Sequence, residues 1–169
     1  MAIFVGIYVM SFVGFLLHYY FKRPMSYPKC IELLLLYQLV FNLGCLGLLS
    51  FIGLTFMPQR AADELGWTIC HFQQELANVN LGYGVVGFLA IWFRGLFWTA
   101  TVISASIWLF GDGLHHFFMA FWDQERGLGT LGIIFYTDIL IPVILVLLLY
   151  LYHQSHPHIK NWKIVEPSK

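Results

Sequence analysis

The sequence predicts an all-α integral membrane protein, a helical bundle of about five transmembrane helices. Hydrophobic residues make up 59% of the chain and charged residues only 11%, and the mean hydropathy is +0.73. The apolar residues lie in long stretches, and the 169 residues accommodate about five segments of roughly 20 residues, the length that crosses a bilayer. We therefore expect a single transmembrane domain over residues 1–169, without a soluble domain.

The first, second and last apolar segments are easily recognised, at residues 3–21, 31–57 and 131–152. Lys22 and Arg23 follow the first segment. Because a signal peptide has its basic residues before the apolar run, the first segment is predicted to be a retained span. A polar loop follows the second segment, and the tail after the last one, residues 153–169, is predicted to be cytoplasmic.

The region between these segments requires a choice between one span and two. Residues 80–110 are apolar except for Arg94, which makes them too long for one span and short for two. If both helices extend outward, two spans fit, at residues 70–93 and 95–121. The turn then lies at Arg94, among aromatic residues of the kind that gather at the headgroup boundary. These aromatic residues are Trp92, Phe93, Phe97 and Trp98. Arg94 is thus predicted to lie at the membrane interface.

Basic residues support the five-span count. Five spans place seven of the nine Lys and Arg residues on one side, and only Arg60 and Arg126 on the other. The seven are Lys22, Arg23, Lys29, Arg94, Lys160, Lys163 and Lys169. Because basic residues concentrate in cytoplasmic loops, the N-terminus is predicted to be outside and the C-terminus cytoplasmic. We expect a plasma membrane location, in particular a bacterial inner membrane. The basic residues form no clustered patch, so a nucleic-acid partner is not expected.

Ionisable residues lie at one level in the outer halves of three predicted spans. Such residues cost a few kcal/mol each inside a membrane and commonly carry a function. The candidates are His71 and Glu75 in the third span, Asp112, His115 and His116 in the fourth and Asp138 in the fifth, with Asn78 and Thr137 as supporting polar residues. Residues four apart share a helix face, which pairs His71 with Glu75 and Asp112 with His116. The sequence therefore predicts a site at which Glu75, Asp112, His116 and Asp138 approach one another.

Several ligands and roles are compatible with this set. Carboxylate and imidazole groups bind divalent metals such as zinc, iron or manganese, and they also bind protons or small polar ligands. The same groups can instead form a structural network. Haem is an alternative, since His71 with His115 or His116, and His18 with His153, could supply axial ligands from two helices, although haem needs no carboxylates.

The function class stays open at this point. A binding or transport module is one hypothesis. An enzyme is a weaker one, because the chain has neither an HExxH nor a GxSxG motif. The third is an accessory subunit that associates with other membrane subunits or with copies of itself, in contact with the lipid bilayer.

Three glycines, Gly82, Gly84 and Gly87, spell GxGxxG. This dinucleotide fingerprint requires a preceding strand, whereas here the glycines lie within a predicted span. Small residues in a span allow helices to approach closely, so a packing role is predicted.

Three sequence patterns resemble a small, mainly bacterial family of polytopic membrane proteins whose domain is of unknown function. The patterns are FQQELANVNLGYGVVG, GDGLHH and YTDILIP, between Phe72 and Tyr150. The resemblance implies that Glu75, Asp112, His116 and Asp138 belong to the family's polar signature. It also implies a glycine before the histidine, where this chain has His115. It does not imply an activity.

Overall fold

The computed structural model describes residues 2–65, 67–122 and 133–156, and every regular element in these ranges is a helix. The predicted all-α class is thus confirmed. Four helices are long and separate: α1 (Ala2–Phe21), α5 (Phe72–Leu89), α6 (Leu96–Trp122) and α7 (Ile133–Ser155). A further long rod consists of α2 (Tyr27–Gln38), a π-helical segment η1 (Leu39–Cys45) and α3 (Leu46–Phe56) in direct succession. The short helix α4 (Pro58–Leu65) occupies the predicted polar loop.

Three of these helical segments are long and apolar enough to cross a membrane: Ile3–Phe21, Tyr27–Phe56 and Phe135–Ser155. They indicate a membrane-embedded chain in a lipid environment. The helices α5 and α6 are not among the segments that are long and apolar enough to cross a membrane. The count of five spans therefore stays a prediction. The end of α7 at Ser155 makes the first residues of the predicted tail helical, and residues 157–169 lie outside the described ranges.

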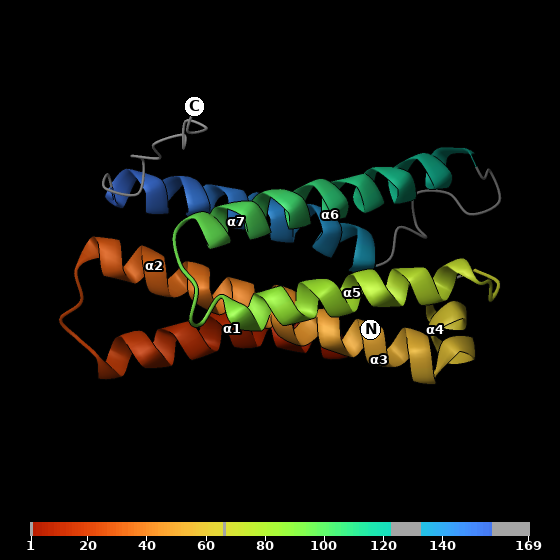
Figure 1. Ribbon diagram of the computed structural model, residues 1–169, viewed down its shortest axis with the longest axis horizontal. Coiled ribbons are helices and arrows are strands. Elements are labelled where there is room, and N and C mark those ends of the chain that lie inside the picture. Colours follow the sequence, from red (N-terminus) through yellow and green to blue (C-terminus); the bar gives the residue numbers. More distant parts are fainter. Residues whose placement is uncertain (1, 66, 123–132, 157–169) are drawn as a thin grey trace, which may run out of the picture.

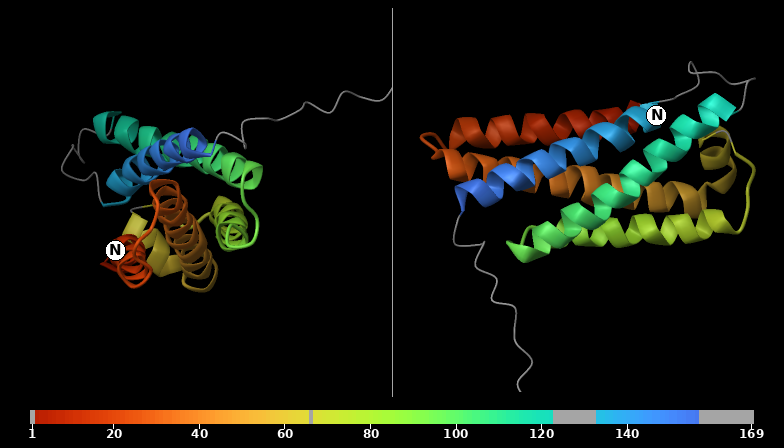
Figure 2. Two further views of the ribbon diagram at one scale, coloured as in Figure 1. Left: turned by 90° about the vertical axis from the view of Figure 1, so that its left-hand side faces the viewer. Right: turned by 90° about the horizontal axis from the view of Figure 1, so that it is seen from above.

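The rod formed by α2, η1 and α3 has neighbours along its whole length. It packs against α1 and α5, and α7 packs on its α2 part. The antiparallel pair α6 and α7 lies at an angle across these helices (Figures 1 and 2). Although α5 and α6 are neighbours in sequence, they make few contacts. The right-hand view of Figure 2 shows why, since α6 diverges from α5 beyond the turn that joins them.

Glycines hold α5 close to η1 and α3. A Cβ atom at Gly87 would collide with the backbone of Gly44, and one at Gly47 would lie 2.7 Å from the carbonyl oxygen of Asn80. The backbone of α5 is therefore in contact with the backbones of η1 and α3, as the predicted packing role of Gly87 requires. Gly82 differs, because a Cβ atom there would meet nothing within 4 Å.

The turn predicted at Arg94 is present. The helix α5 ends at Leu89 and α6 begins at Leu96, and Gly95 adopts a φ of 64°, a backbone conformation that suits glycine. The indole Nε1 of the fully buried Trp98 donates a hydrogen bond of 2.9 Å to the carbonyl oxygen of Ala90. This bond ties the start of α6 to the end of α5, so the region is a helical hairpin.

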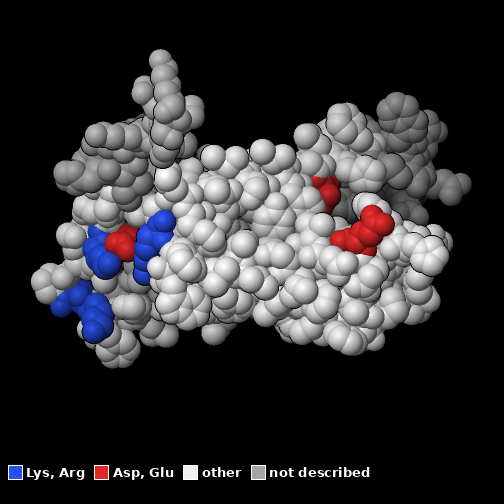
Figure 3. Space-filling model, in the orientation of Figure 1, with Lys and Arg blue, Asp and Glu red and all other residues white. Residues whose placement is uncertain are grey.

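Charged residues separate toward the two ends of the bundle. The connections that carry Lys22, Arg23 and Arg94 lie at one end, together with the start of α2, whereas α4 with Arg60 lies at the other. On the face shown in Figure 3, the basic side chains gather at the first end, and carboxylates occur near both ends. Arg126 and the three C-terminal lysines lie outside the described residues. The described part of the chain thus has the charge pattern that the orientation prediction used.

Candidate functional site

Four of the predicted site residues come together where α6 packs against α7. Asp138 of α7 is buried, with 8% of its surface exposed, and Asp112 and His116 of α6 are half-buried. The charge of Asp112 acts on Asp138 and on His116, and His115 acts on both Asp112 and His116. The rings of His115 and His116 have centroids 6.2 Å apart. Two acidic and two imidazole groups therefore share one electrostatic environment, which we call the acid–histidine cluster.

Gly113 allows the two helices of this cluster to approach. A Cβ atom at Gly113 would lie 2.7 Å from Cδ1 of Ile139 and 3.5 Å from Cβ of Asp138. Asp138 is thus packed directly against the helix turn that carries Asp112. The pairing of Asp112 with His116 follows from their separation by four residues on one helix face.

Glu75 and His71 lie outside the acid–histidine cluster. Both are exposed, and neither is among the charges that act on Asp112, His116 or Asp138. The buried face of α5 consists of Gln73, Ala77, Asn80, Gly84 and Gly87. Glu75 is two residues from both Gln73 and Ala77, so it points away from this face. The sequence period predicts that Glu75 and His71 share a face, but it does not reveal which face of α5 the bundle buries.

Asn78, predicted to support the site, accepts a hydrogen bond of 3.3 Å from the side-chain amide of Gln74. The same amide lies 3.3 Å from the hydroxyl of Thr55 in α3. These contacts connect α5 with α3 and do not involve the acid–histidine cluster. Thr137 is adjacent in sequence to Asp138 and is half-buried.

The histidines considered as haem ligands contact other partners. His18 Nδ1 lies 3.2 Å from the hydroxyl of Tyr37, and His153 Nε2 lies 3.1 Å from the hydroxyl of Thr99. Each imidazole is thus joined to a neighbouring helix, His18 to α2 and His153 to α6. His71 immediately precedes α5, outside the cluster that contains His115 and His116.

The described residues contain no group of three or more His, Cys, Asp or Glu side chains arranged to hold a metal ion. The four members of the acid–histidine cluster interact through their charges without such an arrangement. All four members are ionisable side chains.

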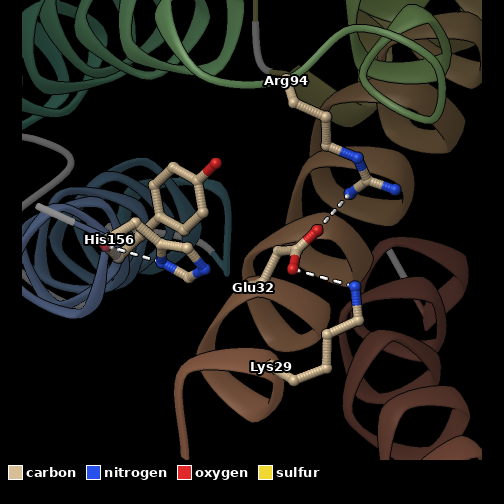
Figure 4. Close-up of polar contacts among 5 residues, drawn as sticks. Lys29, Glu32, Arg94 and His156 are labelled. Atoms are coloured by element: carbon tan, nitrogen blue, oxygen red, sulfur yellow. Dashed lines mark hydrogen bonds and ion pairs between the residues drawn. The ribbon is translucent and has the colours of Figure 1, made fainter. Parts of the chain in front are cut away.

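A second polar group, which the sequence reasoning missed, lies at the opposite end of the bundle. Glu32 of α2 pairs with Lys29 Nζ at 2.9 Å and with Arg94 Nη1 at 3.5 Å. Figure 4 shows Arg94 reaching from the hairpin to Glu32, with Lys29 on the other side of the carboxylate. The Arg94 guanidinium also lies over the Trp98 ring, 4.8 Å from its centroid. Arg94, predicted to lie at the interface, thus connects the hairpin to α2.

A third polar group crosses the apolar interior between α1 and the central rod. The side-chain amide of Gln38 donates a hydrogen bond of 2.9 Å to the hydroxyl of Ser11, which donates one of 2.6 Å to the carbonyl of Tyr8. The amide of Asn42 donates to the side-chain oxygen of Gln38 at 2.6 Å, and its own oxygen Oδ1 has no partner within the described structure. We call Ser11, Gln38 and Asn42 the polar ladder.

The sequence does contain signals for the second and third groups. Lys29 and Glu32 are three residues apart, and Gln38 and Asn42 are four apart, the separations at which helical side chains interact. Gln38 and Asn42 also interrupt an apolar run, as polar residues that join membrane helices do.

Comparison with known proteins supplies a family without an activity. No curated protein and no solved structure matches the chain. The model of a protein family described as "Family of unknown function (DUF6790)" matches residues 1–158, well beyond the segment in which the sequence patterns were recognised. This chain therefore belongs to that family of unknown function.

Proposed function

We propose that this chain is a multi-pass membrane protein that binds and exchanges protons through its acid–histidine cluster. The observation that carries the proposal is the packing of Asp138 against the turn of α6 that carries Asp112, a carboxylate on which His116 also acts. Three ionisable groups on two adjoining apolar helices are costly to keep unless they serve one another or a ligand.

Charge supports a proton as the ligand. Two carboxylates that act on each other repel when both are ionised, and burial removes the water that would weaken this repulsion. A proton on one carboxyl relieves the repulsion, and a positive His116 compensates the other. Groups coupled in this way gain and lose protons as a set, which is the behaviour that the proposed function requires.

The distribution of basic residues supports an orientation. The end with Lys22, Arg23, Lys29 and Arg94 would face the cytoplasm of a bacterial cell by the positive-inside rule. The acid–histidine cluster then lies in the outer half of the inner membrane, with the N-terminus outside. Protons would be exchanged with the external aqueous phase.

Infrared spectroscopy of the purified protein at a series of pH values tests the proposal, since protonated and ionised carboxyl groups absorb differently. We expect a carboxyl signal that changes with pH and is lost in Asp138→Asn, and a shift of its pH midpoint in Asp112→Asn. Asp63→Asn is the matched control, because Asp63 is exposed on α4.

Two outcomes would contradict this function. One is a spectrum of Asp138→Asn that equals that of the unaltered protein. The other is an Asp112→Asn variant in which the Asp138 signal keeps its midpoint, because the two carboxyls would then not share protons. Circular dichroism of each variant verifies that its helices are retained.

A second candidate is an accessory subunit of a membrane complex, and the surface of α1 favours it. Among the described residues of α1 only Ser11 is buried, so most of this helix is available to lipid or to a partner helix. Purification in a mild detergent separates the candidates, because an accessory subunit is recovered with partners in fixed stoichiometry. Recovery of the chain alone, with the carboxyl signal intact, argues for the proton-binding function.

A further inference from the structure

An open groove runs between α5 and α6. It has a volume of about 480 Å³, and apolar or small side chains dominate its walls, including Val86 of α5 with Phe97, Ala100 and Ser104 of α6. Gly82 contributes no side chain at a point where a Cβ atom would meet nothing within 4 Å. The groove lies where the two helices diverge from the hairpin that joins them (Figure 2).

The groove begins one helical turn from the hairpin. Phe97 lines it, and the amide of Phe97 donates a hydrogen bond of 3.3 Å to the carbonyl of Arg94. From Phe97 to Ser104 the wall extends over roughly 10 Å along α6. Beyond Ser104, the stacked rings of Tyr83 and Trp108, 4.8 Å between centroids, bridge the two helices. The groove thus runs from the basic end of the bundle toward its middle.

Positive charge exceeds negative charge at the hairpin end. Two cations, Arg94 and Lys29, share the single carboxylate of Glu32. The Arg94 side chain remains 39% exposed and that of Lys29 59% exposed. The Arg94 guanidinium lies over the Trp98 ring, and its ion pair with Glu32 is made through Nη1. A guanidinium in this setting binds a phosphate by charge-assisted hydrogen bonds.

We propose that Arg94 and the α5–α6 groove bind one anionic phospholipid, with the phosphate at Arg94 and Lys29 and an acyl chain between the helices. The charge selects an anionic headgroup, and the groove extends away from that charge, as an acyl chain extends from its phosphate into the membrane. An apolar space inside a membrane is filled by hydrocarbon, because an empty one forfeits van der Waals contacts.

Native mass spectrometry of the purified protein tests this site with two lipids of identical acyl chains, phosphatidylglycerol and phosphatidylcholine. We expect phosphatidylglycerol to bind more tightly by about fivefold or more, as one basic residue contributes about 1 kcal/mol toward an anionic lipid surface. Arg94→Gln should remove this preference, and Arg94→Lys should retain much of it. Arg60→Gln, which changes an exposed arginine at the other end of the bundle, should have no effect.

The acyl chain has its own test. Ser104→Phe fills the groove and should weaken the binding of both lipids, and inorganic phosphate at matched concentration should not displace phosphatidylglycerol. Equal binding of the two lipids to the unaltered protein would overturn the proposal, as would equal effects of Arg94→Gln and Arg60→Gln. If Ser104→Phe leaves lipid binding unchanged but disrupts a dimer, the groove belongs to a second copy of the chain.

Discussion

At the scale of single residues, the polar ladder shows how amide side chains are accommodated in an apolar interior. Gln38 is fully buried. Its side-chain nitrogen donates a hydrogen bond to Ser11, and its side-chain oxygen accepts one from Asn42. A buried polar group without a partner is expensive, so each member depends on the next. The ladder joins α1, which is otherwise mostly exposed, to the central rod. Its member Asn42 lies within the π-helical segment η1, a kind of irregularity that often marks functional positions.

Gln38→Leu should therefore lower the free energy of unfolding by about 1–2 kcal/mol, because it leaves the Asn42 amide without its acceptor. The double variant Gln38→Leu/Asn42→Leu should recover part of this loss, since no unpaired amide remains. Unfolding in mixed micelles with increasing dodecyl sulfate measures both. Gln59→Leu on exposed α4 serves as the control, and a loss no larger than in this control would show that the ladder does not stabilise the fold.

At the scale of helices, the closeness of α5 to the central rod decides which of its residues are buried. Gly44 and Gly47 of the rod face Gly87 and Gly84 of α5, so backbone meets backbone and van der Waals contact is dense. This fixes the rotation of α5 about its axis, and the rotation directs Glu75 outward. The same packing leaves α5 apart from α6, which creates the groove.

Gly87→Ala should destabilise the protein by about 1–3 kcal/mol, because the added methyl group meets the Gly44 backbone, which cannot rotate away. Gly82→Ala is the internal control in the same helix. It meets open space and should leave stability unchanged or raise it by up to about 1 kcal/mol through helix propensity. Thermal unfolding in detergent compares the two, and equal effects would contradict the close contact of α5 with η1.

At the scale of the whole molecule, the two ends differ in charge and in chemistry. One end carries Lys22, Arg23, Lys29 and Arg94 with Glu32, and the other carries α4 with Arg60 and lies nearer the acid–histidine cluster. A membrane protein with such a difference inserts in one orientation, since basic loops are retained in the cytoplasm.

Labelling with a membrane-impermeant maleimide on intact cells tests this orientation. The native Cys70 is an exposed free thiol in the connection before α5, and it should be labelled from outside. In a Cys70→Ser background, Lys22→Cys should be labelled only after the membrane is permeabilised. The reverse pattern would place the C-terminal end of α7 outside, and labelling of both sites from one side would contradict a span over Tyr27–Phe56.

The sequence alone determined the helical class, the membrane environment and the hairpin at Arg94, because each depends on composition or on local signals along the chain. Apolar length, a glycine suited to positive φ and aromatic residues at a boundary need no knowledge of distant partners. It also predicted that Asp112, His116 and Asp138 lie near one another, since depth along a helix follows from its constant rise. Only the tertiary structure decided that Glu75 faces outward, that Glu32 binds Arg94 and that Ser11 meets Gln38. These facts depend on how each helix is rotated against its neighbours, and side-chain packing between distant segments sets that rotation.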